Sequence, residues 1–222
     1  MKRLFLLLLC LALILSTSSV AFAKVDNNMV DTVTRDKILL DNLSKEYNLK
    51  DVDKVPEGIV PIKFNSIDEL KAFLEKQPKG PVEIHKTYYA NDFLIDKNNI
   101  NDMNSNVILE STGKHHINTS ETVNIGGFVS LDADVFTQVR SLGGTHLEEI
   151  ITDCKEWTSL TGVTLGVEWD ERYAYHVISS DRYRVDVYGG GVLNEYLIVD
   201  GLLKIASYPI DLSVSYYGGI IN

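Results

Sequence analysis

The sequence has little cysteine, which limits how the protein can be stabilised. Only Cys10 and Cys154 occur in 222 residues, and Cys10 lies in an N-terminal segment that we expect to be removed. The one remaining cysteine cannot form an intrachain disulfide. Because 45% of the residues are hydrophobic, we expect a buried core to supply the stability instead.

Long apolar runs are equally scarce. The run from Leu4 to Leu15 is shorter than the roughly 20 residues of a membrane-spanning helix, and no longer run follows, so no stable transmembrane anchor is expected. It lies between the basic pair Lys2-Arg3 and the small-residue pattern Ala21-Phe22-Ala23. That order is typical of a secretory signal peptide. We therefore predict a signal peptide over 1–23, cleavage near Ala23-Lys24 and a secreted, extracellular product.

Positive charge is also in short supply. The chain has 21 Lys and Arg against 31 Asp and Glu, a net charge of −10, and loss of the signal peptide lowers it to −12. A surface of this sign disfavours nucleic acid and anionic lipid as partners. Export without disulfides, in a chain rich in Lys, Asn and Ile, is typical of a Gram-positive bacterium.

Complete catalytic and metal-binding motifs are missing. No Gly-x-Ser-x-Gly nucleophile elbow, His-Glu-x-x-His metal motif or Gly-x-Gly-x-x-Gly phosphate loop occurs. His146-Leu147-Glu148 has no later Pro-Cys-x-x-Cys, and the Asn- and Asp-rich stretch 91–106 lacks the glycine of a calcium loop. His115 and His116 are expected in a solvated turn, and Cys154 in the core. No cofactor or metal ion is therefore expected.

The first part of the mature chain, residues 24–105, is predicted to be a small helical region that ends in the Asn- and Asp-rich linker. Apolar residues on one face predict a helix over 27–49, and a short strand is expected over 59–64. The segment Ser66-Ile67-Asp68-Glu69 is a capping-box pattern that predicts the start of a second helix. Pro78-Lys79-Gly80 is expected to end it.

The second part, residues 106–222, is predicted to be an antiparallel β domain because apolar and polar residues alternate along it. The turn signal Asp200-Gly201 predicts a two-residue hairpin, Gly189-Gly190-Gly191 a second reversal and Asp170-Glu171-Arg172 a loop. The stretch 122–140 adds one or two strands. Further strands are predicted near 163–169, 173–179, 183–188, 192–199, 202–207 and 210–217, whereas 145–157 fits a helix or a strand.

These patterns predict a mainly β fold. About eight antiparallel strands favour a β-sandwich or a partly closed barrel in the C-terminal half, preceded by the small helical region.

His176 and Asp186 are the catalytic candidates. If 180–182 forms a three-residue loop, these two residues pair across neighbouring strands, with Gly166 opposite His176. A histidine oriented by a carboxylate is two thirds of a nucleophilic triad. The pair also fits an ordinary contact on a solvated sheet face, and a register shift of one residue would remove it.

Tyrosines suggest a different kind of site. The chain holds 11 tyrosines, and eight of them lie between residues 173 and 217. Those on the solvated face, for which Tyr188 and Tyr217 are the candidates, would form a surface suited to carbohydrate or protein contact. Ordinary strand composition is the plainer explanation.

These features favour a secreted, non-enzymatic β-domain protein that binds an unknown macromolecule or assembles with a cell-surface component. One alternative is a secreted antibacterial, bacteriocin-like or membrane-acting protein whose amphipathic strands insert into a bilayer, although the charge of −12 disfavours anionic membranes. The other is a hydrolase that uses the His176–Asp186 pair. Whether the protein is an enzyme is left open.

Overall fold

The structure is a computed structural model of the chain. It describes residues 27–93, 111–123, 126–143 and 146–221. The predicted signal peptide, most of the predicted linker and the predicted boundary near residue 105 lie outside these residues.

The chain divides into two compact units, Met1–Leu39 and Leu40–Asn222. Among the described residues, the first unit contains only the larger part of helix α2 (Asn27–Glu46). This helix confirms the prediction over 27–49. No helix in the described part of the chain is long and apolar enough to cross a membrane.

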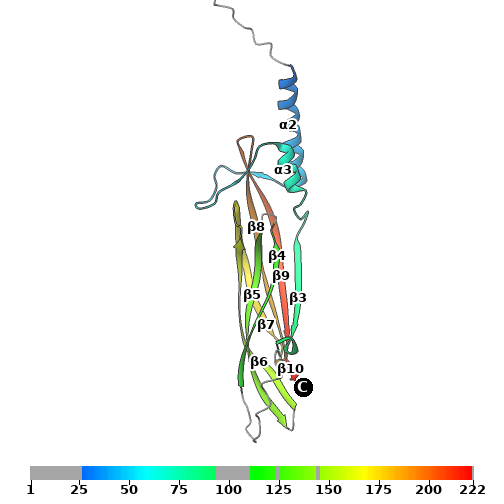
Figure 1. Ribbon diagram of the computed structural model, residues 1–222, viewed down its shortest axis with the longest axis vertical. Helices are drawn as coiled ribbons and strands as arrows, with labels where there is room; N and C mark the ends of the chain where they lie inside the picture. The colour runs from blue at the N-terminus through cyan, green and yellow to red at the C-terminus, as the bar shows by residue number, and fades with distance from the viewer. Residues whose placement is uncertain (1–26, 94–110, 124–125, 144–145, 222) are drawn as a thin grey trace, which may run out of the picture. The chain divides into compact units, whose positions relative to one another are not determined.

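Two sheets make up most of the second unit (Figure 1). Sheet A contains β1 (Lys50–Asp51), β2 (Ile62–Phe64), β3 (Val82–Tyr89), β7 (Val167–Ile178), β8 (Arg184–Val199) and β9 (Leu202–Tyr217). Sheet B contains β4 (Ser111–Thr122), β5 (Gly127–Gly143), β6 (His146–Gly162) and β10 (Gly219–Ile221). The predicted mainly β fold with a preceding helical region is confirmed, and residues 146–157 of the ambiguous stretch belong to β6.

The centre of sheet A is the long hairpin of β8 and β9. Asp200 and Gly201 form its turn with φ angles of 49° and 74°, as the Asp-Gly signal predicted. Strand β7 pairs antiparallel with the other side of β8, and β3 pairs parallel with β9. Strands β1 and β2 add short pairs to β9 and β8, so the predicted helical region supplies three strands of this sheet.

Two predicted interruptions are wrong, because the strands continue through them. The glycines 189–191 lie inside β8, and residues 170–172 lie inside β7, where the register shifts between Glu171 and Tyr173. A Cβ on Gly191 would lie 3.0 Å from the carbonyl carbon of Asp170. The absence of a side chain at Gly191 therefore lets β7 approach β8 closely. Glycine within a strand can serve such a close approach as well as a turn.

The core lies between the inner faces of the two sheets. Sheet B supplies buried Val129, Leu131 and Val135 from β5 and Ile151 from β6, and sheet A supplies Val185, Val187, Leu212 and Val214. Cys154 is buried among them as a free thiol, as expected. This packing leaves one face of each sheet in solvent.

Helix α3 (Ile67–Leu74) begins at the predicted capping sequence. The hydroxyl oxygen of Ser66 accepts a hydrogen bond from the Glu69 backbone N–H at 3.2 Å. The Glu69 carboxylate accepts from the Asn65 backbone N–H at 2.8 Å, whereas the capping box predicted the Ser66 N–H. Ile67, Leu70 and Leu74 are the buried face of the helix.

Replacement of Gly191 by alanine should lower the free energy of unfolding by about 1–3 kcal/mol. The new Cβ would lie against the Asp170 backbone, which cannot move without disturbing the β7–β8 ladder. Urea unfolding measures the change. The matched control is Gly80→Ala, whose Cβ would meet nothing within 4 Å and whose stability should stay within about 0.5 kcal/mol of the parent. Equal losses in both variants would contradict the close approach of β7.

Candidate binding surface

Three tyrosines form a row on the outer face of sheet A. Tyr173 and Tyr175 come from β7, and Tyr188 lies directly across from Tyr175 on β8. The ring centroids of Tyr173 and Tyr175 are 5.8 Å apart, and Tyr175 stacks on Tyr188 at 5.1 Å. Tyr175 is 48% exposed and Tyr173 38%, so these two rings are open to solvent, whereas Tyr188 is half-buried.

A hollow of about 270 Å³ lies beside the tyrosine row. Its lining comes from β3, β7, β8 and β9 and comprises Tyr173, Tyr188, Glu83, Ile84, His85, Asp211, Leu212 and Ser213. The Tyr173 hydroxyl donates a hydrogen bond to Asp211 Oδ1 at 2.6 Å. Partial burial and this hydrogen bond raise the pKa of Tyr173 to about 12, so the ring is neutral at physiological pH.

A second tyrosine pair extends the same face toward the end of β9. Tyr89 of β3 stacks on Tyr217 at 5.4 Å, and the Arg184 guanidinium lies over the Tyr217 ring at 5.4 Å. Arg184 also forms an ion pair with Asp186 at 2.8 Å. We call the tyrosine row together with Tyr89 and Tyr217 the tyrosine face. Both predicted binding residues, Tyr188 and Tyr217, belong to it, and their role remains a prediction.

The predicted cross-strand pair of His176 and Asp186 is wrong. The structure pairs His176 with Val187, and Val177 with Asp186, a register one residue away from the predicted one. Neighbouring residues of a strand point to opposite faces, so His176 lies on the inner face and Asp186 on the outer one. Gly166 instead lies against β2 and Tyr196.

Each member of the predicted pair has another partner. His176 Nδ1 lies 2.7 Å from Glu156 Oε2 of β6, across the space between the two sheets. The Asp186 carboxylate accepts hydrogen bonds from Arg184 and from the Ser215 hydroxyl, the latter at 2.5 Å. No single site therefore contains both side chains.

The predicted solvated turn at His115 and His116 is also wrong, because both residues lie in β4. His115 points inward, and its Nε2 lies 2.6 Å from Glu149 Oε1, while the Tyr216 hydroxyl donates to Glu149 Oε2 at 2.7 Å. Burial opposes ionisation of Glu149, but these hydrogen bonds outweigh it and lower its pKa. The cluster is a satisfied polar contact inside the core.

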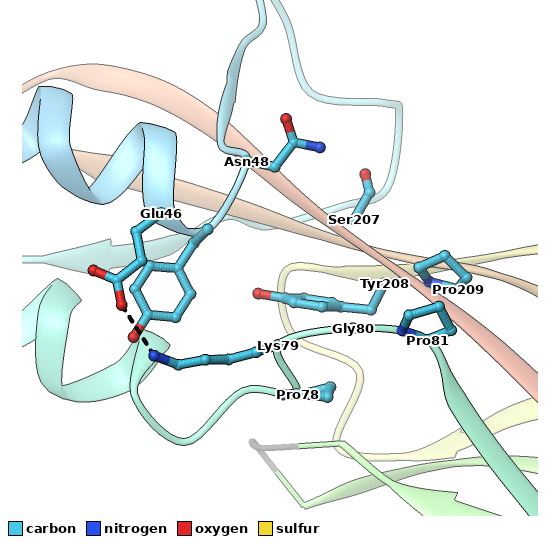
Figure 2. Close-up of a pocket in the computed structure, with 10 residues that line it drawn as sticks. Glu46, Asn48, Pro78, Lys79, Gly80, Pro81, Ser207, Tyr208 and Pro209 are labelled. Carbon is cyan, nitrogen blue, oxygen red and sulfur yellow. Dashed lines mark hydrogen bonds and ion pairs between the residues drawn. The ribbon is translucent and has the colours of Figure 1, made fainter.

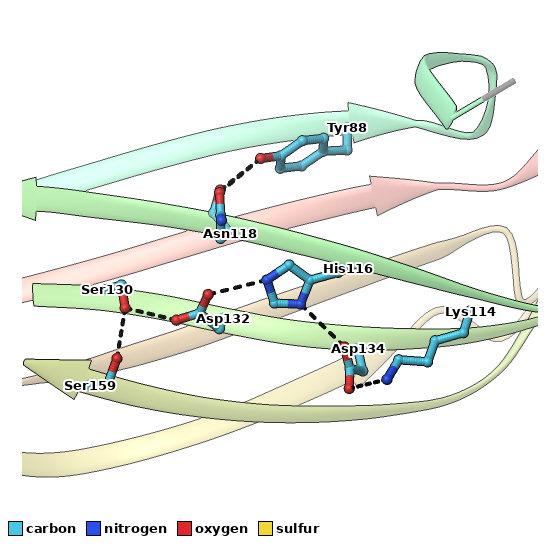
Figure 3. Close-up of polar contacts among 8 residues, drawn as sticks. All are labelled: Tyr88, Lys114, His116, Asn118, Ser130, Asp132, Asp134 and Ser159. Atoms are coloured by element: carbon cyan, nitrogen blue, oxygen red, sulfur yellow. Dashed lines mark hydrogen bonds and ion pairs between the residues drawn. The ribbon is translucent and has the colours of Figure 1, made fainter. Parts of the chain in front are cut away.

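His116 points outward from sheet B and lies between two carboxylates (Figure 3). Its ring nitrogens lie 3.3 Å from Asp132 and 3.2 Å from Asp134. Lys114 contacts Asp134 at 2.8 Å and, by this hydrogen bond, lowers the pKa of that carboxyl group despite some desolvation. Exposed ion pairs of this kind contribute little stability, and we interpret them as a solvated network.

A fully buried carboxyl group lies elsewhere in sheet A and has no counterpart in the sequence predictions. Both oxygens of Glu195 accept from Gln77 Nε2 at 2.8 Å, and the residue is 0% exposed. Burial, only partly offset by this hydrogen bond, raises the pKa of Glu195 to about 7. Tyr208 faces it, and burial followed by the Glu195 charge raises the pKa of that tyrosine as well.

Tyr208 also lines a hollow of about 190 Å³ (Figure 2). The hollow is lined by Glu46, Tyr47, Asn48, Pro78, Lys79, Gly80, Pro81, Ser207, Tyr208 and Pro209. Lys79 Nζ lies 3.0 Å from Glu46 Oε1 and over the Tyr47 ring at 5.3 Å. The ion pair is exposed, with side-chain exposures of 66% and 53%, so Lys79 and Glu46 neutralise each other at the surface.

No family model, curated protein or solved structure matches this chain.

Glu195 should make the protein less stable as the pH rises from about 4.5 to about 7. Its folded-state pKa of about 7 exceeds the ordinary value of 4.5, so the folded protein binds more protons in this window. The contribution of Glu195 to the free energy of unfolding is complete below about pH 4.5 and is lost above about pH 7. The loss amounts to about 3 kcal/mol. In Glu195→Gln, the free energy of unfolding should change little between these pH values. At about pH 8 this variant should be more stable than the parent.

Urea unfolding at several pH values measures this effect. Glu57→Gln, at an exposed position, is the matched control and should keep the parental slope. If Glu195→Gln also retained that slope, the raised pKa would be refuted.

Proposed function

We propose that this protein is a secreted, non-enzymatic binding protein that engages a macromolecular partner through the tyrosine face of sheet A. The observation that carries the proposal is the stacked tyrosine row Tyr173, Tyr175 and Tyr188, in which Tyr173 and Tyr175 are exposed. Export is supported by the N-terminal sequence, with its basic start, apolar run and small-residue cleavage pattern.

The chemistry of tyrosine suits this role. A tyrosine ring offers a large apolar area and a hydroxyl group, with few rotatable bonds to immobilise. On the tyrosine face these rings also contact one another and rigid strands, so little side-chain entropy remains to be lost on binding. Tyrosine is enriched at protein interfaces for the same reasons.

The arrangement favours a protein partner over a glycan. Stacking of Tyr175 on Tyr188 uses one face of each ring, whereas a sugar ring lies best on an open aromatic face. Ring edges and hydroxyl groups remain available, and Glu83 and Asp211 in the adjoining hollow supply hydrogen-bond acceptors. These acceptors and the acidity of the chain favour a polypeptide surface that carries Lys or Arg.

Removal of a central ring should abolish most of the binding. The purified protein is immobilised and screened against secreted proteins, cell-wall material and glycans, and the affinity of each hit is then measured for variants. Tyr175→Ala and Tyr188→Ala should each weaken binding of the partner at least about tenfold, as residues at the centre of an interface do.

Phe128→Ala is the matched control, because Phe128 is a 42% exposed aromatic residue on sheet B. It should bind as the parent does. An equal loss in this control, or no binding to any of the three classes of material, would refute the proposal. If only glycans bound, the tyrosine face would still be the binding site, but the partner would be a glycan and not a protein.

A further inference from the structure

Three side chains with metal-binding atoms meet between the sheets. Cys154 and Glu156 lie two residues apart on β6 and pair with the buried Val135 and Ala133 of β5. They therefore point to the inner face of sheet B. His176 points toward them from the inner face of sheet A.

The potential ligand atoms of these residues all lie within 4.8 Å of one another. The closest contact joins His176 Nδ1 to Glu156 Oε2 at 2.7 Å. Within the described residues, this is the one group of three His, Cys, Asp or Glu side chains close enough to hold a metal ion. Bonds of Zn²⁺ to sulfur, nitrogen and oxygen are about 2.0–2.3 Å long, so small side-chain rotations suffice to surround an ion.

We propose that Cys154, Glu156 and His176 form a binding site for a thiophilic divalent transition metal, with Zn²⁺ as its natural occupant. A thiolate and an imidazole select zinc and its neighbours over Mg²⁺ and Ca²⁺, which prefer oxygen ligands. Three protein ligands leave the fourth tetrahedral position to water.

Partial burial of the cluster is consistent with such an ion. Cys154 is 5% exposed, whereas the Glu156 and His176 side chains are 16% and 28% exposed, which gives an ion a path from solvent. Zn²⁺ would displace the thiol proton to solvent and replace it at sulfur.

The site would join the two sheets. Glu156 and Cys154 belong to sheet B and His176 belongs to β7, which pairs only with β8 among the described strands of sheet A. An ion held by all three would attach this edge strand to β6. Among the described residues Cys154 is a free thiol, so such a link would supply a cross-connection between the sheets that no disulfide provides there.

Cobalt is the first probe, because Co²⁺ occupies zinc sites and reports on its ligands. Metal-free protein titrated with Co²⁺ should show a thiolate-to-cobalt charge-transfer band that saturates at one ion per chain. Zn²⁺ should then remove the band, raise the unfolding temperature and slow alkylation of the Cys154 thiol. The alkylation measurement needs no variant and therefore tests the site even if a substitution fails to fold.

Variants assign the ligands. Cys154→Ser should lose the charge-transfer band, and Glu156→Gln and His176→Gln should each weaken Zn²⁺ binding at least about tenfold. His116→Gln is the control, because His116 lies beside two carboxylates on the opposite face of sheet B. Absence of the band and of alkylation protection, or loss of Zn²⁺ binding in His116→Gln but not in His176→Gln, would overturn the proposal.

Discussion

The register of β8 between β7 and β9 is the constraint on which the rest of sheet A depends. Val185 and Val187 of β8 are fully buried against sheet B, so each even-numbered neighbour faces solvent. This alternation directs Tyr188 and Asp186 to the outer face, and through the β7 ladder it exposes Tyr175 and turns His176 inward. A shift of β7 by one residue along β8 would turn Tyr173 and Tyr175 to the inner face.

The same constraint explains why polar groups occur on the inner faces of the sheets. The register decides which residues of a strand point inward, including polar ones. A polar side chain buried in this way needs a hydrogen-bond partner. Glu149 has His115 and Tyr216, Glu195 has Gln77, and His176 has Glu156. These pairs link residues far apart in the sequence.

Local patterns predicted the elements of this fold well. Period-two alternation predicted the strands, Asp200-Gly201 predicted the hairpin turn, and Ser66 predicted the start of α3. The glycines 189–191 led to a wrong prediction of a turn, because a turn and a close contact between strands both favour glycine. Only the position of the Asp170 backbone, which is not visible in the sequence, distinguishes the two cases.

The candidate sites were less predictable, because each depends on residues from several strands. Tyr188 and Tyr217 could be named from tyrosine enrichment alone. The hollow beside Tyr188 is lined by Glu83 and His85, and these residues belong to β3, a strand that no sequence pattern had indicated. The Cys154, Glu156 and His176 cluster spans two sheets, and no spacing in one strand indicates it. Glu195 shares its face of β8 with the buried Leu193 and Leu197, but a carboxyl group is rarely buried without a partner, and Gln77 lies 118 residues away in the sequence.

Disulfide cross-linking tests the register of β7 on β8 most directly. Residues directly opposite in an antiparallel pair have Cα atoms about 4.5–5.5 Å apart, within reach of a disulfide. Two double variants, each carrying Cys154→Ser to remove the native thiol, are oxidised and compared. The register described here predicts that Val177→Cys with Asp186→Cys forms a cross-link readily. Preferential cross-linking of His176→Cys with Asp186→Cys would instead contradict it and place Tyr173 and Tyr175 on the buried face.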